Sequence, residues 1–286
     1  MVDHDDHVGG LDDDVDATRK RSMPRPVDDG RLAPERRARP LLVDEMSVDF
    51  RSPDLVGFQQ ALAFVREIER PRMPTLVALD QPTIVPNESG MRPVEKSVAS
   101  VISWMGGGVQ PASRGRLAMF GPQAPIWAFL KKLGATENPE ASRTAMEGRH
   151  VMEVFPALAL ASFDTKFFGR LMGPRYNPVR RKTFRRDDWH AVIAAAGAEA
   201  ERFRCRPVVG WLEDLRGLAT PTKSTQDRLD AALCLLIAIR WRLGARDESI
   251  VLGDLQTGYI VAPVSPAVMA RLSQDASGRG VPVNAL

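Results

Sequence analysis

Cysteine, histidine and aromatic residues are scarce in this sequence of 286 residues. There are two cysteines, Cys205 and Cys234, and four histidines, while phenylalanine, tryptophan and tyrosine together make up 6% of the chain. The cysteines lack the spacing of metal ligands, which predicts reduced thiols in a cytoplasmic protein. Two of the histidines, His4 and His7, lie in an acidic segment, so the histidines do not suggest a zinc site.

The sequence also lacks an apolar run long enough to span a bilayer. Its first six residues are acidic in character, which argues against a secretory signal. The chain is 44% apolar and 26% charged, as is usual for a soluble globular protein. These features predict a soluble protein with one sizeable core and no membrane association, and they leave the oligomeric state open.

The chain is expected to form one domain with a tail at each end. Residues 1–7 are predicted to be a disordered acidic tail, and residues 273–286 a loose tail. Between them, residues 8–272 form the predicted domain, which carries an insertion at about residues 164–220. No internal repeat is present.

Two irregular strands are expected near the start of the domain. Residues 8–12 resemble a short strand that ends in Asp12, although glycine weakens a strand interior. The turn signal Asp28-Asp29-Gly30 indicates a hairpin that runs into residues 41–48. Further aspartates follow Asp12 directly, so which of these acids matters chemically stays open.

A buried strand that ends in an acid is the central feature of the pattern. Residues 74–79 form a short apolar run bounded by prolines, which is typical of a strand buried on both faces of an α/β sheet. Apolar residues at helical spacing between Ser52 and Ile68 predict a helix just before it. Asp80 follows the strand at its carboxyl end, where open α/β sheets place their sites. The alternative is that Asp80 merely caps the next turn.

The same pattern of a short strand, an acid and a proline returns at residues 150–156. In an alternating strand Glu153 shares a face with Val151 and Phe155, so it is not expected to be solvated. Helical spacing predicts further helices at residues 92–105, 126–130, 158–163 and 187–203, and a last strand at 258–263 is followed by a short helix near 268–272.

The strongest helical pattern covers residues 222–241. Its second half is apolar on every side, so it must pack against a sheet and a further layer. Asp227 and Asp230 share one face of this helix. With Ser224 as the N-cap, Asp227 approximates a capping box. Asp230 lies deeper, and a buried carboxylate requires a cation or hydrogen-bond donors.

Acids therefore stand at the ends of candidate strands and at the start of a buried helix. Without matching histidines or cysteines, such carboxylates suit a hard divalent ion, Mg²⁺ or Mn²⁺. Two such ions can activate water and stabilise the leaving oxygen in phosphodiester cleavage. The expected metal ligands are Asp12, Asp80, Glu153 and Asp230, and Asp227 is expected to assist them.

Positive charge is concentrated in the insertion, although the formal net charge of the chain is only +3. The residues that stand closest together are Arg180, Arg181, Lys182, Arg185 and Arg186. A run of like charge is usually a solvated face. A footprint for the phosphate backbone of nucleic acid is the alternative, and composition does not decide between them.

Four short motifs occur in a fixed order along the chain. They are Leu79-Asp80-Gln81-Pro82, Arg92-Pro93, Glu153-Val154-Phe155-Pro156 and Asp227-Arg228-Leu229-Asp230-Ala231-Ala232. Together they resemble the DUF429 family, a group of predicted nucleases with a ribonuclease H-like fold, from about residue 75 to residue 263. The resemblance implies an α/β fold with a ribonuclease H-like mixed sheet, helices on both sides and acidic metal ligands. At the front of the chain, Asp13 stands where members of that family have glycine.

The expected function is hydrolysis of phosphodiester bonds in nucleic acid by a metal-dependent nuclease, with the basic residues of the insertion holding the phosphate backbone. One alternative is a catalytically degenerate relative that binds nucleic acid or a protein partner without cleavage. An actin-like phosphotransferase is disfavoured, because it requires an Asp-x-Gly-Thr/Ser loop that Asp12-Asp13-Asp14-Val15 does not supply.

Overall fold

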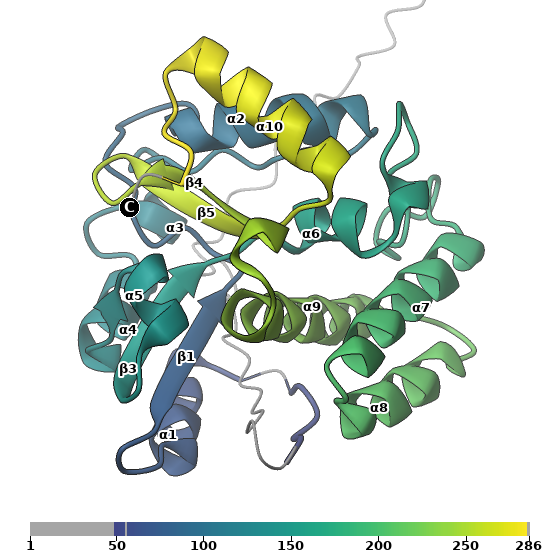
Figure 1. Ribbon diagram of the computed structural model, residues 1–286, viewed down its shortest axis with the longest axis horizontal. Helices are drawn as coiled ribbons and strands as arrows, with labels where there is room; N and C mark the ends of the chain where they lie inside the picture. Colours follow the sequence, from purple (N-terminus) through teal and green to yellow (C-terminus); the bar gives the residue numbers. More distant parts are fainter. Residues whose placement is uncertain (1–48, 55, 285–286) are drawn as a thin grey trace, which may run out of the picture. The chain divides into compact units, whose positions relative to one another are not determined.

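The structure is a computed structural model that describes residues 49–54 and 56–284 (Figure 1). The predictions for the tail at 1–7, for the strands at 8–12 and 41–48, and for Asp12 lie outside the described residues. Within the described part, helices and short strands alternate along the chain and form a mixed α/β architecture. None of its helices is both long enough and apolar enough to cross a membrane.

Three parallel strands form the first sheet. β1 (Pro74–Leu79) and β2 (Thr136–Glu137) lie on either side of β3 (Gly148–Glu153). The pairing of β1 with β3 runs from Pro74 opposite Gly148 to Leu79 opposite Glu153, and it confirms both predicted strands. The carboxyl ends of the three strands therefore meet at one edge, which is where an α/β sheet places a site.

Two antiparallel strands, β4 (Ser249–Asp254) and β5 (Gly258–Pro263), form the second sheet. A parallel bridge between Val154 and Val261 joins it to the end of β3. The prediction of β5 is confirmed, whereas β4 was not predicted. Asp254 closes the turn between the two strands by accepting hydrogen bonds from the N–H groups of Gln256 and Thr257, at 2.8 and 2.6 Å.

Helices cover both faces of the first sheet. α1 (Phe58–Ile68) and α4 (Pro125–Leu133) pack against the face that carries Leu79 and Val151. α1 begins at Phe58, later than the predicted start near Ser52. α9 (Lys223–Leu243) covers the other face and packs against β1 (Figure 1). On that face Ala78 and Met152 belong to the same apolar cluster as Ile237 and Trp241 of α9.

The remaining helices complete two further layers. α2 (Pro93–Trp104) and α10 (Pro266–Arg279) pack on each other and on β4 and β5 (Figure 1). α6 (Pro156–Phe163), α7 (Arg186–Arg202) and α8 (Arg206–Arg216) form a cluster with the far side of α9. The short elements are α3 (Leu117–Phe120), α5 (Pro139–Thr144), η1 (Thr165–Phe167) and η2 (Arg246–Glu248). α9 is thus buried on all sides along its second half, as its apolar pattern predicted.

Two boundaries near the carboxyl end differ from the sequence prediction. α10 runs to Arg279, so residues 273–279 belong to a helix and not to a loose tail. The N-cap of α9 is Thr222, whose side chain accepts from the N–H of Thr225, and not Ser224. Asp227 therefore lies beyond the first turn, and the capping-box role predicted for it is wrong.

Candidate active site

Asp230 and Tyr176 meet on the surface of α9. The Tyr176 hydroxyl donates a hydrogen bond of 2.9 Å to Oδ1 of Asp230, and Nε2 of Gln226 donates one of 3.0 Å to Oδ2. Gln226 reaches Asp230 because it lies four residues earlier in the same helix. The two hydrogen bonds fix the orientation of the Asp230 carboxylate on α9.

Asp80 adds a second negative charge near this hydroxyl. It directly follows β1 and is exposed at the carboxyl edge of the sheet. Successive side chains of a strand point to opposite faces of the sheet. Leu79 faces α1 and α4, so the side chain of Asp80, which comes next, lies on the face that α9 covers. Burial, the Asp230 carboxylate and the charge of Asp80 together raise the pKa of Tyr176 well above its ordinary value. Asp230 therefore contacts this hydroxyl directly, the charge of Asp80 acts on it as well, and the hydroxyl stays protonated at neutral pH.

Asp227 lies one turn before Asp230 and is held by a different partner. Its Oδ1 accepts from Nζ of Lys223 at 2.6 Å, an ion pair between residues four apart on α9. Both side chains of this pair are partly exposed. Asp227 is thus a half-exposed neighbour of Asp230 rather than part of the helix cap.

Glu153 lies in a second, buried cluster. The guanidinium of Arg92 donates to both of its carboxylate oxygens, at 2.8 and 2.5 Å, and the N–H of Thr83 donates to Oε2 at 3.1 Å. Burial raises the pKa of Glu153, and the charge of Arg92 opposes that rise. Glu153 is paired in register with Leu79, so it faces away from α9. The prediction that Glu153 is shielded from solvent is confirmed, and its counter-charge comes from Arg92.

Arg92 is fixed by the start of α2, where it is the N-cap residue. Its backbone N–H donates to Oε2 of Glu95 and its Nε to Oε1, at 3.0 and 3.1 Å. Gly258 lies against the guanidinium with a φ of +99°, and a Cβ built there would stand 2.7 Å from Nη1 of Arg92. A residue without a side chain is therefore required at position 258.

Glu137 is a member of this second cluster that was not predicted from the sequence. It accepts a hydrogen bond from the Thr83 hydroxyl, and burial raises its pKa against the opposing hydrogen bonds of Thr83 and Tyr259. The Tyr259 hydroxyl in turn accepts from the N–H of Glu153 at 3.2 Å. β2 is too short to show an apolar run. The sequence feature that could have identified Glu137 is Glu137-Asn138-Pro139, because it repeats the acid-x-proline pattern that follows β1.

The predicted acids thus fall into two clusters on opposite faces of the sheet. The first contains Asp80 and Asp230 with Tyr176, and the second contains Glu153 with Arg92. Among residues 49–54 and 56–284, no group of three or more His, Cys, Asp and Glu side chains is arranged to hold a metal ion. Asp12, the fourth predicted ligand, lies outside these residues.

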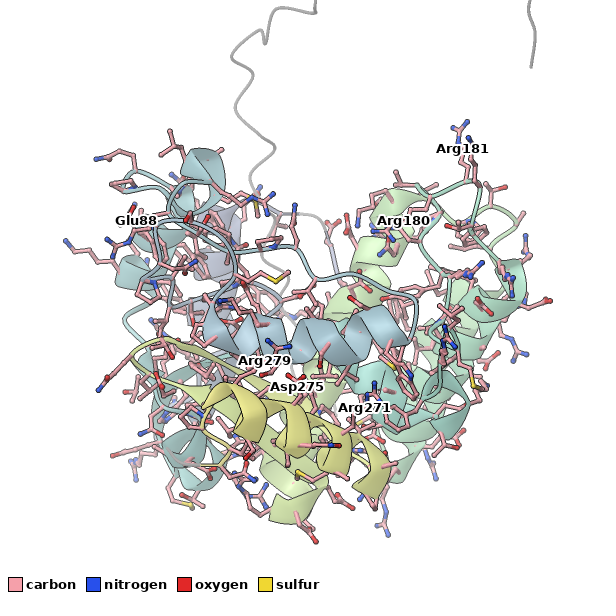
Figure 2. All side chains as sticks on the ribbon, turned by 90° about the horizontal axis from the view of Figure 1, so that it is seen from above. Glu88, Arg180, Arg181, Arg271, Asp275 and Arg279 are labelled. Atoms are coloured by element: carbon pink, nitrogen blue, oxygen red, sulfur yellow. The ribbon has the colours of Figure 1, made fainter. Side chains whose placement is uncertain are left out.

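Most of the basic residues lie in a closed loop that includes Tyr176. The N–H of Arg185 donates to the carbonyl of Arg175 at 2.8 Å, which ties the two ends of the loop together. Arg180, Arg181 and the adjacent Lys182 are exposed at its tip, and Figure 2 shows Arg181 projecting outward. We call residues 175–185 the basic loop.

Arg186 has a different setting from the rest of the basic run. Its guanidinium donates to the carbonyls of Ala219 and Leu218, at 2.5 and 2.7 Å. Arg186 therefore holds the connection between α8 and α9 in place. This connection leads directly into α9, the helix that carries Asp230.

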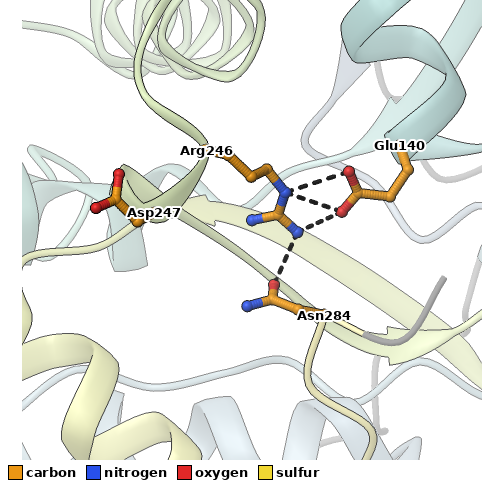
Figure 3. A pocket seen from close by; sticks show the side chains of 4 residues that line it. All are labelled: Glu140, Arg246, Asp247 and Asn284. Atoms are coloured by element: carbon orange, nitrogen blue, oxygen red, sulfur yellow. Dashed lines mark hydrogen bonds and ion pairs between the residues drawn. The ribbon is translucent and has the colours of Figure 1, made fainter.

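A further hollow lies between Glu140, Arg246, Asp247 and Asn284 (Figure 3). Arg246 is engaged there by Glu140 and by Oδ1 of Asn284, while Asp247 points away from it (Figure 3). The guanidinium also lies over the ring of Trp241, with 4.8 Å between its carbon and the ring centroid. Asn284 also accepts a hydrogen bond from the N–H of Val251 in β4, so these contacts hold Asn284 against η2 and β4 and we assign them a structural role.

The architecture and the acids at the sheet edge define a mixed α/β protein with a candidate carboxylate site. A model of the family described as "Protein of unknown function (DUF429)" matches residues 46–254, and the chain belongs to this family. Tyr176, Asp80, Glu153 and Asp230 all lie inside the matched region. No curated protein and no solved structure matches the chain.

Proposed function

We propose that this protein is a divalent-metal-dependent nuclease that hydrolyses phosphodiester bonds, with Asp80 and Asp230 as its central carboxylates. The observation that carries the proposal is that the hydroxyl of Tyr176, a partly buried residue of the basic loop, donates a hydrogen bond to Asp230 and also feels the charge of Asp80 at the carboxyl edge of a parallel sheet. A ribonuclease H-like arrangement, as the motifs of the family imply, is part of the same proposal. It is supported by the parallel sheet and by the bridge from Val154 to Val261.

The donor set at Asp80 and Asp230 fits Mg²⁺ or Mn²⁺. Magnesium is commonly held by one or two carboxylates, with water and substrate phosphates filling the other positions. When bound, the ion would polarise the phosphodiester and lower the pKa of a water molecule. Glu153 fits this role less well, because the guanidinium of Arg92 already neutralises it in the interior.

Other residues of the chain orient the two carboxylates and bind the substrate. Gln226 and Tyr176 fix the orientation of the Asp230 carboxylate, and the end of β1 fixes the position of Asp80. Arg180 and Arg181, at the tip of the basic loop, would contact substrate phosphates. Contacts of this kind hold the nucleic acid without reading its sequence, so the enzyme would tolerate different sequences.

The second candidate is a protein that binds nucleic acid without cutting it. The observation that favours it is the pairing of Glu153 with Arg92, which neutralises one predicted ligand in a cluster separate from Asp230. The basic loop alone then accounts for binding, since phosphate contacts supply most non-specific affinity.

Cleavage assays separate the two candidates. Labelled single- and double-stranded DNA, single-stranded RNA and an RNA–DNA hybrid are incubated with the protein in Mg²⁺, in Mn²⁺ and in EDTA. We expect metal-dependent cleavage that Asp80→Asn and Asp230→Asn each abolish. Asp247→Asn, at an exposed acid of the Arg246 hollow, is the matched control and should cleave normally. Binding without cleavage in any metal would support the second candidate, and absence of both would refute the two together.

A further inference from the structure

We infer that Tyr176 is a positioning residue. Its hydroxyl orients the Asp230 carboxylate and holds the basic loop in place, so cation binding and the position of the loop depend on the same hydrogen bond. The inference rests on the proposed cation site at Asp80 and Asp230. It adds a residue to that site which neither the motifs nor the spacing of the acids indicates.

The first observation concerns the position of Tyr176 in the basic loop. It lies next to Arg175, whose N–H donates to Oδ2 of Asp188 at 2.7 Å and whose carbonyl accepts from Arg185. Its ring packs against the apolar cluster of α6, α7, α8 and α9, as does the ring of Phe184 near the other end of the loop. Tyr176 is therefore at the base of the loop, while the charged residues are at the tip.

The second observation concerns what the hydroxyl contacts. It donates to Oδ1 of Asp230, a residue 54 positions later in the chain. A ring without the hydroxyl would still fill the apolar cluster, so packing alone does not require tyrosine here. The polar contact selects one orientation of the Asp230 carboxylate and places the base of the basic loop directly beside it.

A group that hydrogen-bonds to a metal ligand affects the metal affinity of the site without contacting the metal. Loss of a group that orients a ligand commonly lowers metal affinity or activity by 10- to 100-fold. Tyr176→Phe removes the hydroxyl and keeps the ring, so it isolates this function. We expect the variant to bind Mn²⁺ at least about 10-fold more weakly than the unaltered chain.

The two tyrosines of the chain supply a direct readout. Tyr176 contacts Asp230 in the first acid cluster, whereas Tyr259 contacts the backbone of Glu153 in the second. Protein labelled with ¹³C in the tyrosine rings should therefore give one set of signals for each cluster, assigned with Tyr176→Phe and Tyr259→Phe. Bound Mn²⁺ broadens the signals of nearby nuclei. We expect addition of Mn²⁺ to broaden Tyr176 at concentrations that leave Tyr259 sharp.

Calorimetry and amide exchange complete the test. Mn²⁺ affinity is measured for the unaltered chain, for Tyr176→Phe and for the control Tyr259→Phe, and exchange is followed in residues 175–185. We expect only Tyr176→Phe to weaken Mn²⁺ binding, and we expect it to speed exchange in the basic loop while α7 stays protected. Circular dichroism melts check that each variant folds.

The outcomes distinguish this inference from the proposed function. If Mn²⁺ broadens Tyr176 in the unaltered chain but Tyr176→Phe binds the ion equally well, Tyr176 is only a packing residue and the inference is wrong. If Mn²⁺ broadens neither tyrosine, or broadens Tyr259 alone, the cation site at Asp80 and Asp230 is wrong and the inference is overturned with it.

Discussion

Arg92 binds Glu153 through two hydrogen bonds of 2.8 and 2.5 Å in the interior of the protein, where both side chains are almost fully excluded from solvent. A guanidinium and a carboxylate match each other in this two-point geometry. Each neutralises a charge that would be costly to bury alone. The structural role of Glu153 follows from this partner, which the strand pattern around Glu153 does not reveal.

The first prediction concerns the stability of this pair. Glu153→Gln leaves the buried Arg92 with Glu95 as its main counter-charge, so we expect the free energy of unfolding to fall by about 3 kcal/mol. Urea denaturation in EDTA measures the change. Glu88→Gln, which breaks a long and exposed contact with Arg114, is the control and should change stability by less than about 0.5 kcal/mol. Full stability of Glu153→Gln combined with weaker Mn²⁺ binding would instead make Glu153 a metal ligand.

The second prediction separates the two acids of α9. Asp230→Asn places an amide against the donors Tyr176 and Gln226, so we expect it to cost about 1 kcal/mol in EDTA and to abolish cleavage. Asp227→Asn loses a partly exposed pair with Lys223, worth about 0.3 kcal/mol, and should reduce cleavage partially. Thermal melts and one cleavage assay measure both. Unchanged cleavage by Asp230→Asn would exclude this carboxylate from the reaction.

The third prediction concerns the basic loop. Replacing Arg180 and Arg181 together by alanine should weaken binding to an oligonucleotide and make it less sensitive to salt, because fewer counterions are released. The slope of log K against log salt should fall by about 1 to 2. The control is the pair Lys131 and Lys132, which is exposed at the end of α4. Equal losses from both double variants would mean that net charge, and not the loop, determines binding.

The fourth prediction is a pH dependence at the turn between β4 and β5. Burial acts to raise the pKa of Asp254, but the hydrogen bonds from Thr257 and Gln256 outweigh it, and the pKa is lowered in the folded protein. The stabilisation from Asp254 is therefore complete above its unfolded pKa of about 3.9 and is lost as pH falls through the lower folded pKa. We expect Asp254→Asn to melt below the unaltered chain at pH 6 and the gap to narrow below pH 4. A gap that is constant down to pH 2 would contradict this.

Local patterns in the sequence were sufficient for several parts of the fold. The apolar run before Asp80 and the short apolar segment before Glu153 predicted the strands β1 and β3. Their parallel pairing with each other was not predicted, and β1 is only partly buried along most of its length. Continuous apolar character after Asp230 predicted that α9 is buried on all sides. The two-residue β2 that positions Glu137 has no such run and was missed, and β4 was missed although it carries a short apolar run.

The partners of the acids were decided by the tertiary structure alone. The amino-acid pattern alone places Asp80, Glu153 and Asp230 at the ends of strands or inside a buried helix, since burial and periodicity are local properties. It did not determine which charge or donor meets each of them. Arg92 and Glu153 are 61 positions apart, and Tyr176 and Asp230 are 54 apart. Pairing at such separations depends on how the sheet, α2 and α9 pack together, so only the folded chain shows that Glu153 meets a guanidinium and Asp230 a hydroxyl.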